Sequence, residues 1–144
     1  MPEWAHGHPP VIVTVDPWCH FMIRSRKGQI AEARGRLAES SACAALERDG
    51  WSILARRIRT SAGEIDMIAE KEGLLAIVEV KARPTLADAA AALSVRQQKR
   101  LFDAAEIVLA THPQWGIEGV RFDIMLVDST GVVRRITDAF RGDG

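Results

Sequence analysis

The stretch GEIDMIAEKEGLLAIVEVK, residues 63–81, decides the fold of this chain. It holds two apolar runs, residues 65–70 and 74–81, which are joined by the short polar segment Lys71-Glu72-Gly73. Two such runs with a short join that contains glycine predict a β-hairpin. The second run ends in Glu79-Val80-Lys81, and Asp66 is the second residue of the first run, so the hairpin carries charged side chains at its open end.

The flanking sequence predicts helices and further strands around this hairpin. Residues 29–48 form an alanine-rich helix that Asp49-Gly50 ends, and Ser94 opens a second helix, to about residue 110, with a capping box. Its inner stripe is Leu101, Ala104, Ala105 and Val108. Strands are predicted at 51–55, leading into the basic run 56–59, and at 122–127 and 132–136. The order is helix, three strands, helix, two strands, which predicts an α/β fold with a mixed sheet flanked by helices.

Length and composition indicate one ordinary globular domain. The chain has 144 residues, of which 47% are hydrophobic and 26% charged. No apolar stretch approaches the ~18 residues of a membrane span, and no secretory leader is recognisable. The two cysteines, Cys19 and Cys43, indicate reduced thiols, so we expect a cytoplasmic protein. The proline-rich residues 1–27 are predicted to be a partly disordered extension, and residues 28–144 the domain.

The hairpin carries the strongest candidate site. Glu79 and Lys81 lie two residues apart in a strand and therefore project from the same face. An acid and an ammonium group at the end of an apolar strand are costly to desolvate unless they pair or bind something. Together with Asp66, they suit a Mg²⁺ or Mn²⁺ site at which Lys81 stabilises negative charge on a phosphate. The alternative is a buried acid–lysine pair with a purely structural role.

Other polar residues allow two interpretations each. Glu39 lies at the edge of the apolar stripe of the first helix, either overhanging the metal site or turned to solvent. Glu64 either shares the face of Asp66 or lies at the mouth of the site. Gln98 faces inward, either toward Lys81 or a phosphate or toward a buried backbone group. For Arg121 and Asp123, on one strand face, we expect a structural salt bridge.

Net charge neither requires nor excludes a nucleic-acid partner. The chain has 19 basic and 19 acidic residues, whereas dedicated nucleic-acid binders usually carry a basic excess. The basic residues are nevertheless clustered. Two of these clusters are candidates for contacts with phosphates at the rim of a cleft, or else are solvated surface: Arg56, Arg57 and Arg59, and Arg96, Lys99 and Arg100.

At this point the chain resembles a known family. The motifs that carry the resemblance are Gly35-x-x-Ala38-Glu39, Gly50-Trp51-x-Ile53-Leu54-x-Arg56, Gly63-Glu64-Ile65-Asp66-x-Ile68, Val78-Glu79-Val80-Lys81-x-Arg83, Gln98 and Arg121-Phe122-Asp123. Over residues 28–128 they are similar to the YraN family, which is itself similar to the PD-(D/E)XK nucleases, including Holliday-junction resolvases. Two departures are Arg57, where relatives often have Asn, and residues 1–27, which have no recognisable counterpart.

The resemblance implies a restriction-endonuclease-like α-β-β-β-α-β(-β) core. It also implies a catalytic set of Glu39, Asp66, Glu79 and Lys81, with Gln98 and Glu64 as accessory residues. The expected ligands of Mg²⁺ or Mn²⁺ are Asp66, Glu79, the backbone carbonyl of Val80, and Glu39.

Two functions follow from these observations. The first is a metal-dependent endonuclease acting on DNA, with branched or repair intermediates among its candidate substrates. The second is a non-catalytic nucleic-acid-binding or adaptor protein that keeps the nuclease fold. A complete set of acids and lysine favours the first function, and the neutral net charge favours the second. By analogy with resolvases, a homodimer is expected.

Overall fold

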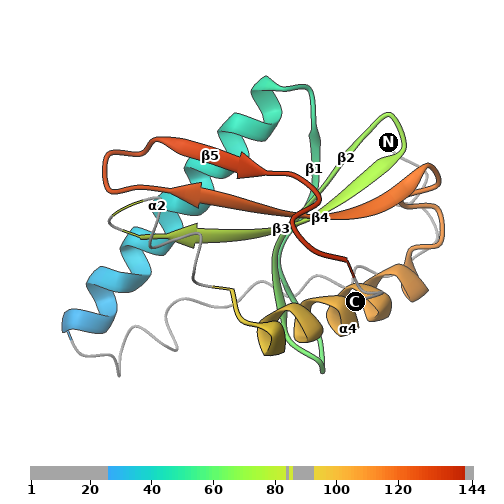
Figure 1. Cartoon of the computed structure of the whole chain (residues 1–144), viewed down its shortest axis with the longest axis horizontal. Coiled ribbons are helices and arrows are strands. Elements are labelled where there is room, and N and C mark those ends of the chain that lie inside the picture. Colours follow the sequence, from blue (N-terminus) through green and yellow to red (C-terminus); the bar gives the residue numbers. More distant parts are fainter. Residues whose placement is uncertain (1–25, 84, 86–92, 142–144) are drawn as a thin grey trace.

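A computed structural model of the chain describes residues 26–83, 85 and 93–141. Within them lie two helices and five strands (Figure 1): α2 (Arg26–Arg48), β1 (Ser52–Arg59), β2 (Glu64–Lys71), β3 (Leu74–Ala82), α4 (Val95–Thr111), β4 (Gly119–Val127) and β5 (Val133–Ile136). This is the predicted order, and it matches the restriction-endonuclease-like core with β5 added. The extension predicted over residues 1–27 falls outside the described residues except at its end, where α2 already begins at Arg26.

The five strands form one mixed sheet in the order β1-β2-β3-β4-β5. Neighbouring strands are antiparallel except β3 and β4, which run parallel from Leu74↔Gly119 to Ala82↔Val127. A parallel pair needs a crossover connection, and α4 lies within it. Consequently β3, which carries Glu79 and Lys81, is central in the sheet and paired along its whole length on the β4 side.

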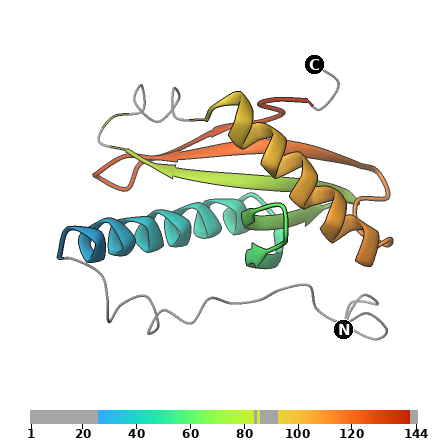
Figure 2. The ribbon, with the colours of Figure 1, turned by 90° about the horizontal axis from the view of Figure 1, so that it is seen from below.

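The helices cover opposite faces of the sheet (Figure 2). On the α2 face, Ala42 and Leu46 pack with Met67, Ala76 and Val78. On the α4 face, the predicted stripe of Leu101, Ala104, Ala105 and Val108 is buried and packs with residues that include Ile68, Leu75 and Ile77. The strand residues therefore alternate between two cores, as period-2 geometry requires. Neither of the described helices is long and apolar enough to cross a membrane.

The first strand is longer than the sequence indicated. β1 was expected at residues 51–55, but it continues through the basic run to Arg59. The reason is pairing with β2, in which Arg56 lies opposite Met67, Ile58 opposite Ile65, and Arg59 opposite Glu64. Ile58 is fully buried while Arg56 and Arg59 are exposed, so the basic run belongs to the sheet although most of its side chains are charged.

Local sequence signals fix the hairpin and the start of α4. Glu72 and Gly73 both have positive φ angles, 53° and 83°, which is the geometry of a two-residue hairpin turn between the paired Lys71 and Leu74. At α4, the Ser94 side chain accepts a hydrogen bond from the Gln97 amide, while the Gln97 side chain accepts one from the Ser94 amide. The predicted capping box is thereby confirmed.

Candidate active site

The candidate site lies where β2 and β3 separate. Their ladder runs from the turn to the pair Met67↔Val78 and ends there, although both strands continue. Beyond this point β2 stays paired with β1, and β3 with β4. The backbone N–H of Val80 therefore lacks a strand partner on the β2 side, and the carboxylate of Asp66 accepts its hydrogen bond at 2.8 Å. This bond anchors Asp66 to the strand that carries the other site residues.

Glu79 and Lys81 project together, as their spacing predicted. The Nζ atom of Lys81 lies 3.4 Å from Oε1 of Glu79, and the two side chains are 12% and 17% exposed, respectively. Their position in β3 continues the series Leu75 and Ile77, which places both on the α4 face. The pair forms an ionic contact in a mostly desolvated setting, where electrostatic interactions are stronger than in water.

Electrostatics confirm that the acids lie close to one another. Burial raises the pKa of Asp66 well above its usual value, and the nearby charge of Glu79 raises it further. The bond from Val80 opposes the rise, while the charges of Glu39 and Glu64 add to it. The pKa of Glu79 is also raised by burial, against the opposing effect of Lys81. Three other carboxylates thus act on Asp66 at the open end of the hairpin.

Glu39 comes to this region from α2, on the other face of the sheet. Its side chain is 15% exposed and accepts a hydrogen bond from Nε of Arg57 at 2.8 Å. Arg57 has a φ of 51°, in the left-handed region that non-glycine residues seldom adopt and that Asn adopts more readily. The sequence placed Arg57 among the candidate nucleic-acid contacts, and in the structure its guanidinium holds Glu39.

The donor set fits a Mg²⁺-type ion bound by two carboxylates rather than by a closed protein shell. Asp66 and Glu79 are adjacent oxygen donors that repel each other when ionised, which a divalent cation would relieve. Among the described residues, no group of three or more His, Cys, Asp or Glu side chains converges as a metal site. Glu39 acts on Asp66 through its charge while it is bonded to Arg57. Its role as a ligand, like that of the Val80 carbonyl, remains a prediction.

A small cavity of about 180 Å³ opens beside Glu79. It is lined by residues of the hairpin entrance, of α4 and of the segment just before α4: Gly63, Glu64, Glu79, Leu93, Gln97, Arg100 and Leu101. Glu64 and Arg100 were both predicted near the site. The amide that lines the cavity is that of Gln97, whereas Gln98 is half-buried on α4. The capping box singled out Gln97 only as a helix start, and nothing in the residue pattern indicated that its side chain would line the cavity.

The predicted basic residues have different surroundings. Arg59 lies 3.8 Å from Glu64, and Lys99 pairs with Asp103 along α4. Arg100 lines the cavity, while Arg56 and Arg96 are exposed. Arg59 and Arg100 therefore lie beside site residues, as does Arg57, which is bonded to Glu39. Contact of any of these side chains with nucleic acid remains a prediction.

Asp123 forms the structural salt bridge that the sequence indicated. Its fully buried carboxylate accepts two hydrogen bonds from Arg121, two from Arg135 and one from the backbone N–H of Asp138, at 2.7 to 3.0 Å. Both guanidiniums also lie over the ring of Trp51, 5.3 and 4.5 Å from its centroid. This network ties β4, β5 and the start of β1 together on the α2 face, so its role is stability.

Comparison with known proteins places this chain in a family. Residues 38–127, which include all four predicted catalytic residues, match the model of the Uncharacterised protein family UPF0102. The chain belongs to family UPF0102. A UPF0102 protein of Granulibacter bethesdensis is 64% identical over 126 residues, which is 88% of this chain and 79% of that protein. A UPF0102 protein of Azorhizobium caulinodans is 45% identical over 119 residues, covering 83% of this chain and 91% of that protein.

Another UPF0102 protein, from Rhodopseudomonas palustris, is 46% identical over 106 residues, 74% of this chain and 82% of that protein. The family resemblance expected from the sequence is thus confirmed at the level of UPF0102. The further similarity to PD-(D/E)XK nucleases remains a prediction, because the family description names no activity.

Proposed function

We propose that this UPF0102 protein is a Mg²⁺- or Mn²⁺-dependent nuclease that hydrolyses phosphodiester bonds of DNA, with branched or repair intermediates as candidate substrates. The observation that carries the proposal is the open end of the β2–β3 hairpin. There Asp66 bonds to the backbone of β3, and Lys81 lies 3.4 Å from Glu79. Two mutually repelling acids and a lysine in a desolvated position are costly for folding, and a bound cation and phosphate would offset that cost.

In this proposal Asp66 and Glu79 hold the metal ion. When bound, the ion neutralises charge on the scissile phosphate and lowers the pKa of a water molecule. Glu79 orients Lys81, whose ammonium group donates hydrogen bonds to the phosphate oxygens as negative charge develops on them. The bond between Asp66 and Val80 fixes the first carboxylate relative to the second, so that both donors keep their geometry without a closed shell of ligands.

A cleavage assay tests the proposal. Labelled single-stranded, linear duplex and four-way-junction DNA is incubated with the protein in Mn²⁺, Mg²⁺ or EDTA. We expect cleavage that EDTA abolishes, and that Asp66→Ala and Glu79→Ala each reduce by about 10²–10³-fold or more, since both remove charge that stabilises the transition state. Glu106→Ala, an exposed acid on α4, is the matched control and should cleave as the wild type does.

Lys81→Ala separates catalysis from a structural pair. It should keep or increase the affinity for Mn²⁺, because a competing cation has gone, while cleavage slows. Loss of folding together with loss of metal binding would instead favour the structural pair. Cleavage that survived both Asp66→Ala and Glu79→Ala would end the assignment at this site.

The second candidate function is nucleic-acid binding without turnover. Its supporting observations are the balanced net charge and the bond that ties Glu39 to Arg57. It predicts that DNA binds in EDTA and that no substrate is cut in Mn²⁺ or Mg²⁺. The same assay, with binding measured in parallel, distinguishes the two functions.

A further inference from the structure

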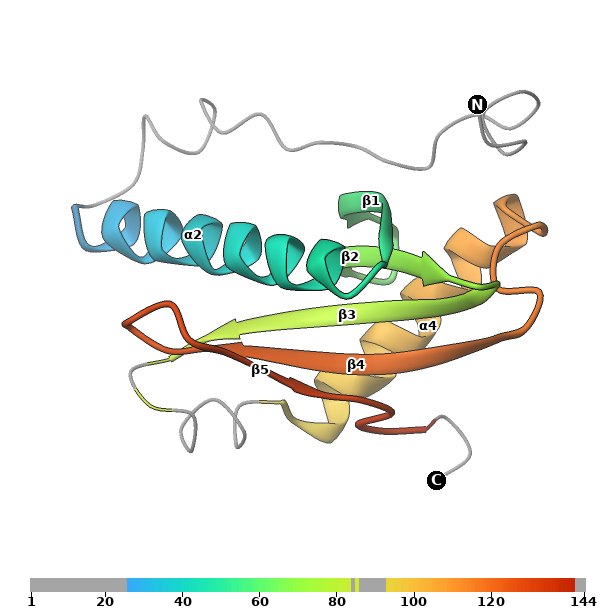
Figure 3. The ribbon, with the colours of Figure 1, turned by 90° about the horizontal axis from the view of Figure 1, so that it is seen from above.

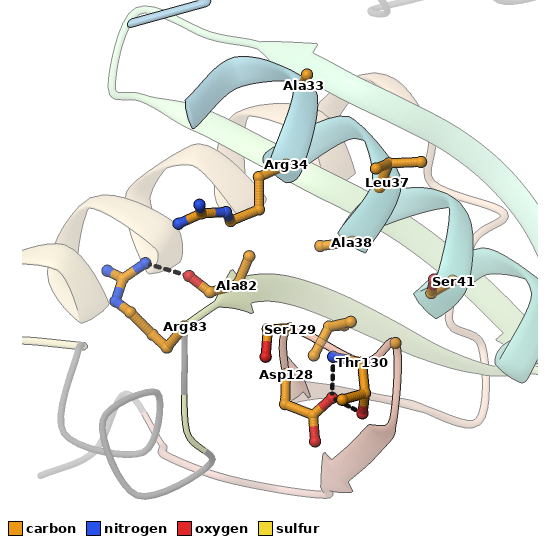
Figure 4. Close-up of a pocket in the computed structure, with 12 residues that line it drawn as sticks. Ala33, Arg34, Leu37, Ala38, Ser41, Ala82, Arg83, Asp128, Ser129 and Thr130 are labelled. Carbon is orange, nitrogen blue, oxygen red and sulfur yellow. Dashed lines mark hydrogen bonds between the residues drawn. The ribbon is translucent and has the colours of Figure 1, made fainter. Parts of the chain in front are cut away.

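A larger pocket lies on the other face of the end of β3. It has a volume of about 730 Å³ and is bounded by α2 from Ala33 to Ser41, by Ala82 and Arg83, and by the turn of residues 127–131 between β4 and β5 (Figure 4). Figure 3 shows the first half of α2 lying along β3 toward this turn, and α2 and β3 are in contact. Cavities that hold small ligands have about 300–1,000 Å³, so this one is of a suitable size.

The pocket is apolar in the middle and basic at one end. Its walls include the side chains of Ala38, Ala82 and Val127, and Leu37 is 71% exposed at its edge. The guanidinium groups of Arg34 and Arg83 extend to the same side of the pocket. Within the part of the chain that the structure describes, neither arginine pairs with an acid, although Arg83 donates a hydrogen bond to the carbonyl of Ala82 at 2.8 Å. This end therefore presents two positive charges to a ligand.

The acid in the pocket wall lies away from the arginines and is occupied by its own turn. Oδ1 of Asp128 accepts hydrogen bonds from the backbone and hydroxyl of Thr130 and from the backbone of Val132. Figure 4 shows Asp128 and Thr130 at the side opposite the two guanidiniums. An anionic group would be attracted to Arg34 and Arg83 and repelled from Asp128, so a bound ligand has one favoured orientation.

We infer that this pocket holds one unpaired nucleotide of the substrate strand, with its base against the apolar walls and its phosphate on Arg34 and Arg83. The inference rests on the proposed function and deepens it, because it selects strands with an unpaired nucleotide over intact duplex. In a duplex the bases are stacked and paired, and a base enters a concave pocket only when it is extruded or already unpaired. Proteins that bind single strands combine a positively charged groove with aromatic side chains on which the bases stack, and in this pocket aliphatic side chains take the place of the aromatic rings.

The position of the pocket favours a nucleotide over an acidic peptide. Ala38 directly precedes Glu39 on α2, and Ala82 directly follows Lys81 on β3, so the two elements that carry site residues also form the pocket walls. Lys81 and Ala82 project from opposite faces of β3, so a strand with its backbone at Lys81 would reach the pocket by passing around the end of β3, where Arg83 lies. A peptide would gain nothing from this proximity.

Binding in EDTA tests the inference without requiring turnover. Fluorescence anisotropy measures the binding of three labelled DNAs of the same length to the full chain. They are a single strand of dT, a duplex and an abasic single strand. The variants are Arg34→Glu and Leu37→Asp, both at exposed positions, and thermal melting checks that they fold. Arg48→Glu is the matched control, since it reverses an exposed charge at the end of the same helix, outside this pocket.

We expect Arg34→Glu and Leu37→Asp each to weaken single-strand binding about tenfold or more, and Arg48→Glu to weaken it less than threefold. Arg34→Glu should also lower the slope of log Kd against log salt by about 0.7, the value for one phosphate of a single strand. The abasic strand should bind more weakly than dT and be less sensitive than dT to Leu37→Asp, since only repulsion of its phosphates by the new carboxylate remains, while it keeps its sensitivity to Arg34→Glu.

Four results would overturn the inference. If Arg34→Glu and Arg48→Glu weakened binding equally, the protein would attract DNA only non-specifically. If the abasic strand bound as tightly as dT, the pocket would contact a phosphate but would not hold a base. A labelled polyglutamate peptide serves as the probe for a protein partner. If Arg34→Glu and Leu37→Asp weakened the binding of this peptide and left dT binding unchanged, the pocket would be assigned to a protein partner. If these pocket variants bind dT as the wild type does and metal-dependent cleavage persists, the pocket assignment alone is wrong.

Discussion

Replacement of Asp123 by asparagine tests the network that joins β4, β5 and the start of β1. Asparagine has nearly the same shape, but it lacks the negative charge and turns one oxygen acceptor into a donor. The buried carboxylate accepts two hydrogen bonds from Arg121 and two from Arg135, and in the Asp123→Asn variant at least one guanidinium faces an NH₂ group. Both arginines would remain in place over Trp51 without a counter-charge.

The magnitude follows from the burial of the three groups. Removing one partner of a buried ion pair costs about 3–5 kcal/mol. The carboxylate is fully buried, but the side chains of Arg121 and Arg135 keep 24% and 16% exposure, so water relieves part of the cost. We therefore expect a loss of about 3 kcal/mol in the free energy of unfolding, which for a domain of this size lowers Tm by about 10 °C.

Urea unfolding of the wild type and Asp123→Asn measures this loss, provided that the m-value is unchanged. The control is Asp103→Asn, whose ion pair with Lys99 is 46% and 75% exposed and should contribute less than about 0.5 kcal/mol. A loss below about 1 kcal/mol for Asp123→Asn, or one equal to that of the control, would refute the structural role of the network.

Four further predictions concern the site and its hairpin. Because the pKa of Asp66 is raised, its ionised form opposes folding, and the free energy of unfolding falls as pH rises through that pKa. In EDTA, Asp66→Asn should therefore have a higher Tm than the wild type, and the difference in Tm should widen as pH rises through the pKa of Asp66. Parallel curves of Tm against pH for the two proteins would contradict this. With Mn²⁺ at about 100 times its Kd, the free energy of unfolding of the wild type should rise by about 2.7 kcal/mol, whereas that of Asp66→Asn should change little. The free energy of unfolding of Arg57→Asn should stay within about 1 kcal/mol of that of the wild type, because relief of the strained left-handed backbone at residue 57 offsets the lost ion pair with Glu39. Calorimetry should show that this variant binds Mn²⁺ more tightly than the wild type. Weaker binding would mean that Arg57 positions Glu39 as a ligand. Gly73→Ala should lower the free energy of unfolding, measured with urea, by more than about 1 kcal/mol. The reasons are the φ of 83° at Gly73 and the added Cβ, which would lie 2.6 Å from Cγ of Glu118. A loss under about 0.5 kcal/mol would show that the turn adapts.

Local patterns in the sequence predicted most of the fold. The glycine-containing join predicted the hairpin, and the Ser94–Gln97 pair predicted the start of α4, because both signals act within a few residues. The length of β1 was missed because its second half is strand only through pairing with β2. For the site, the spacing of Glu79 and Lys81 was sufficient to place them on one face.

Contacts between distant segments were beyond the sequence. The bond between Arg57 and Glu39 joins β1 to α2, and it depends on a left-handed backbone angle that no pattern around Arg57 signals. The bond from Val80 to Asp66 depends on where the β2–β3 ladder ends, which is a property of the whole sheet. The larger pocket is likewise formed by three segments that only folding brings together, namely α2, the end of β3 and the β4–β5 turn.

The two-residue turn at Glu72 and Gly73 limits how this part of the gene can change. Because side chains alternate along a strand, one residue inserted between the turn and Glu79 would send Glu79 and Lys81 into the α2-side core and turn Val80 toward α4. Insertions and deletions here are tolerated only in pairs or with a compensating bulge. Among distant relatives, the spacing between the aspartate and the glutamate is therefore expected to be a better guide to a shared site than the identity of the buried apolar residues between them, which can be replaced by apolar residues of similar volume.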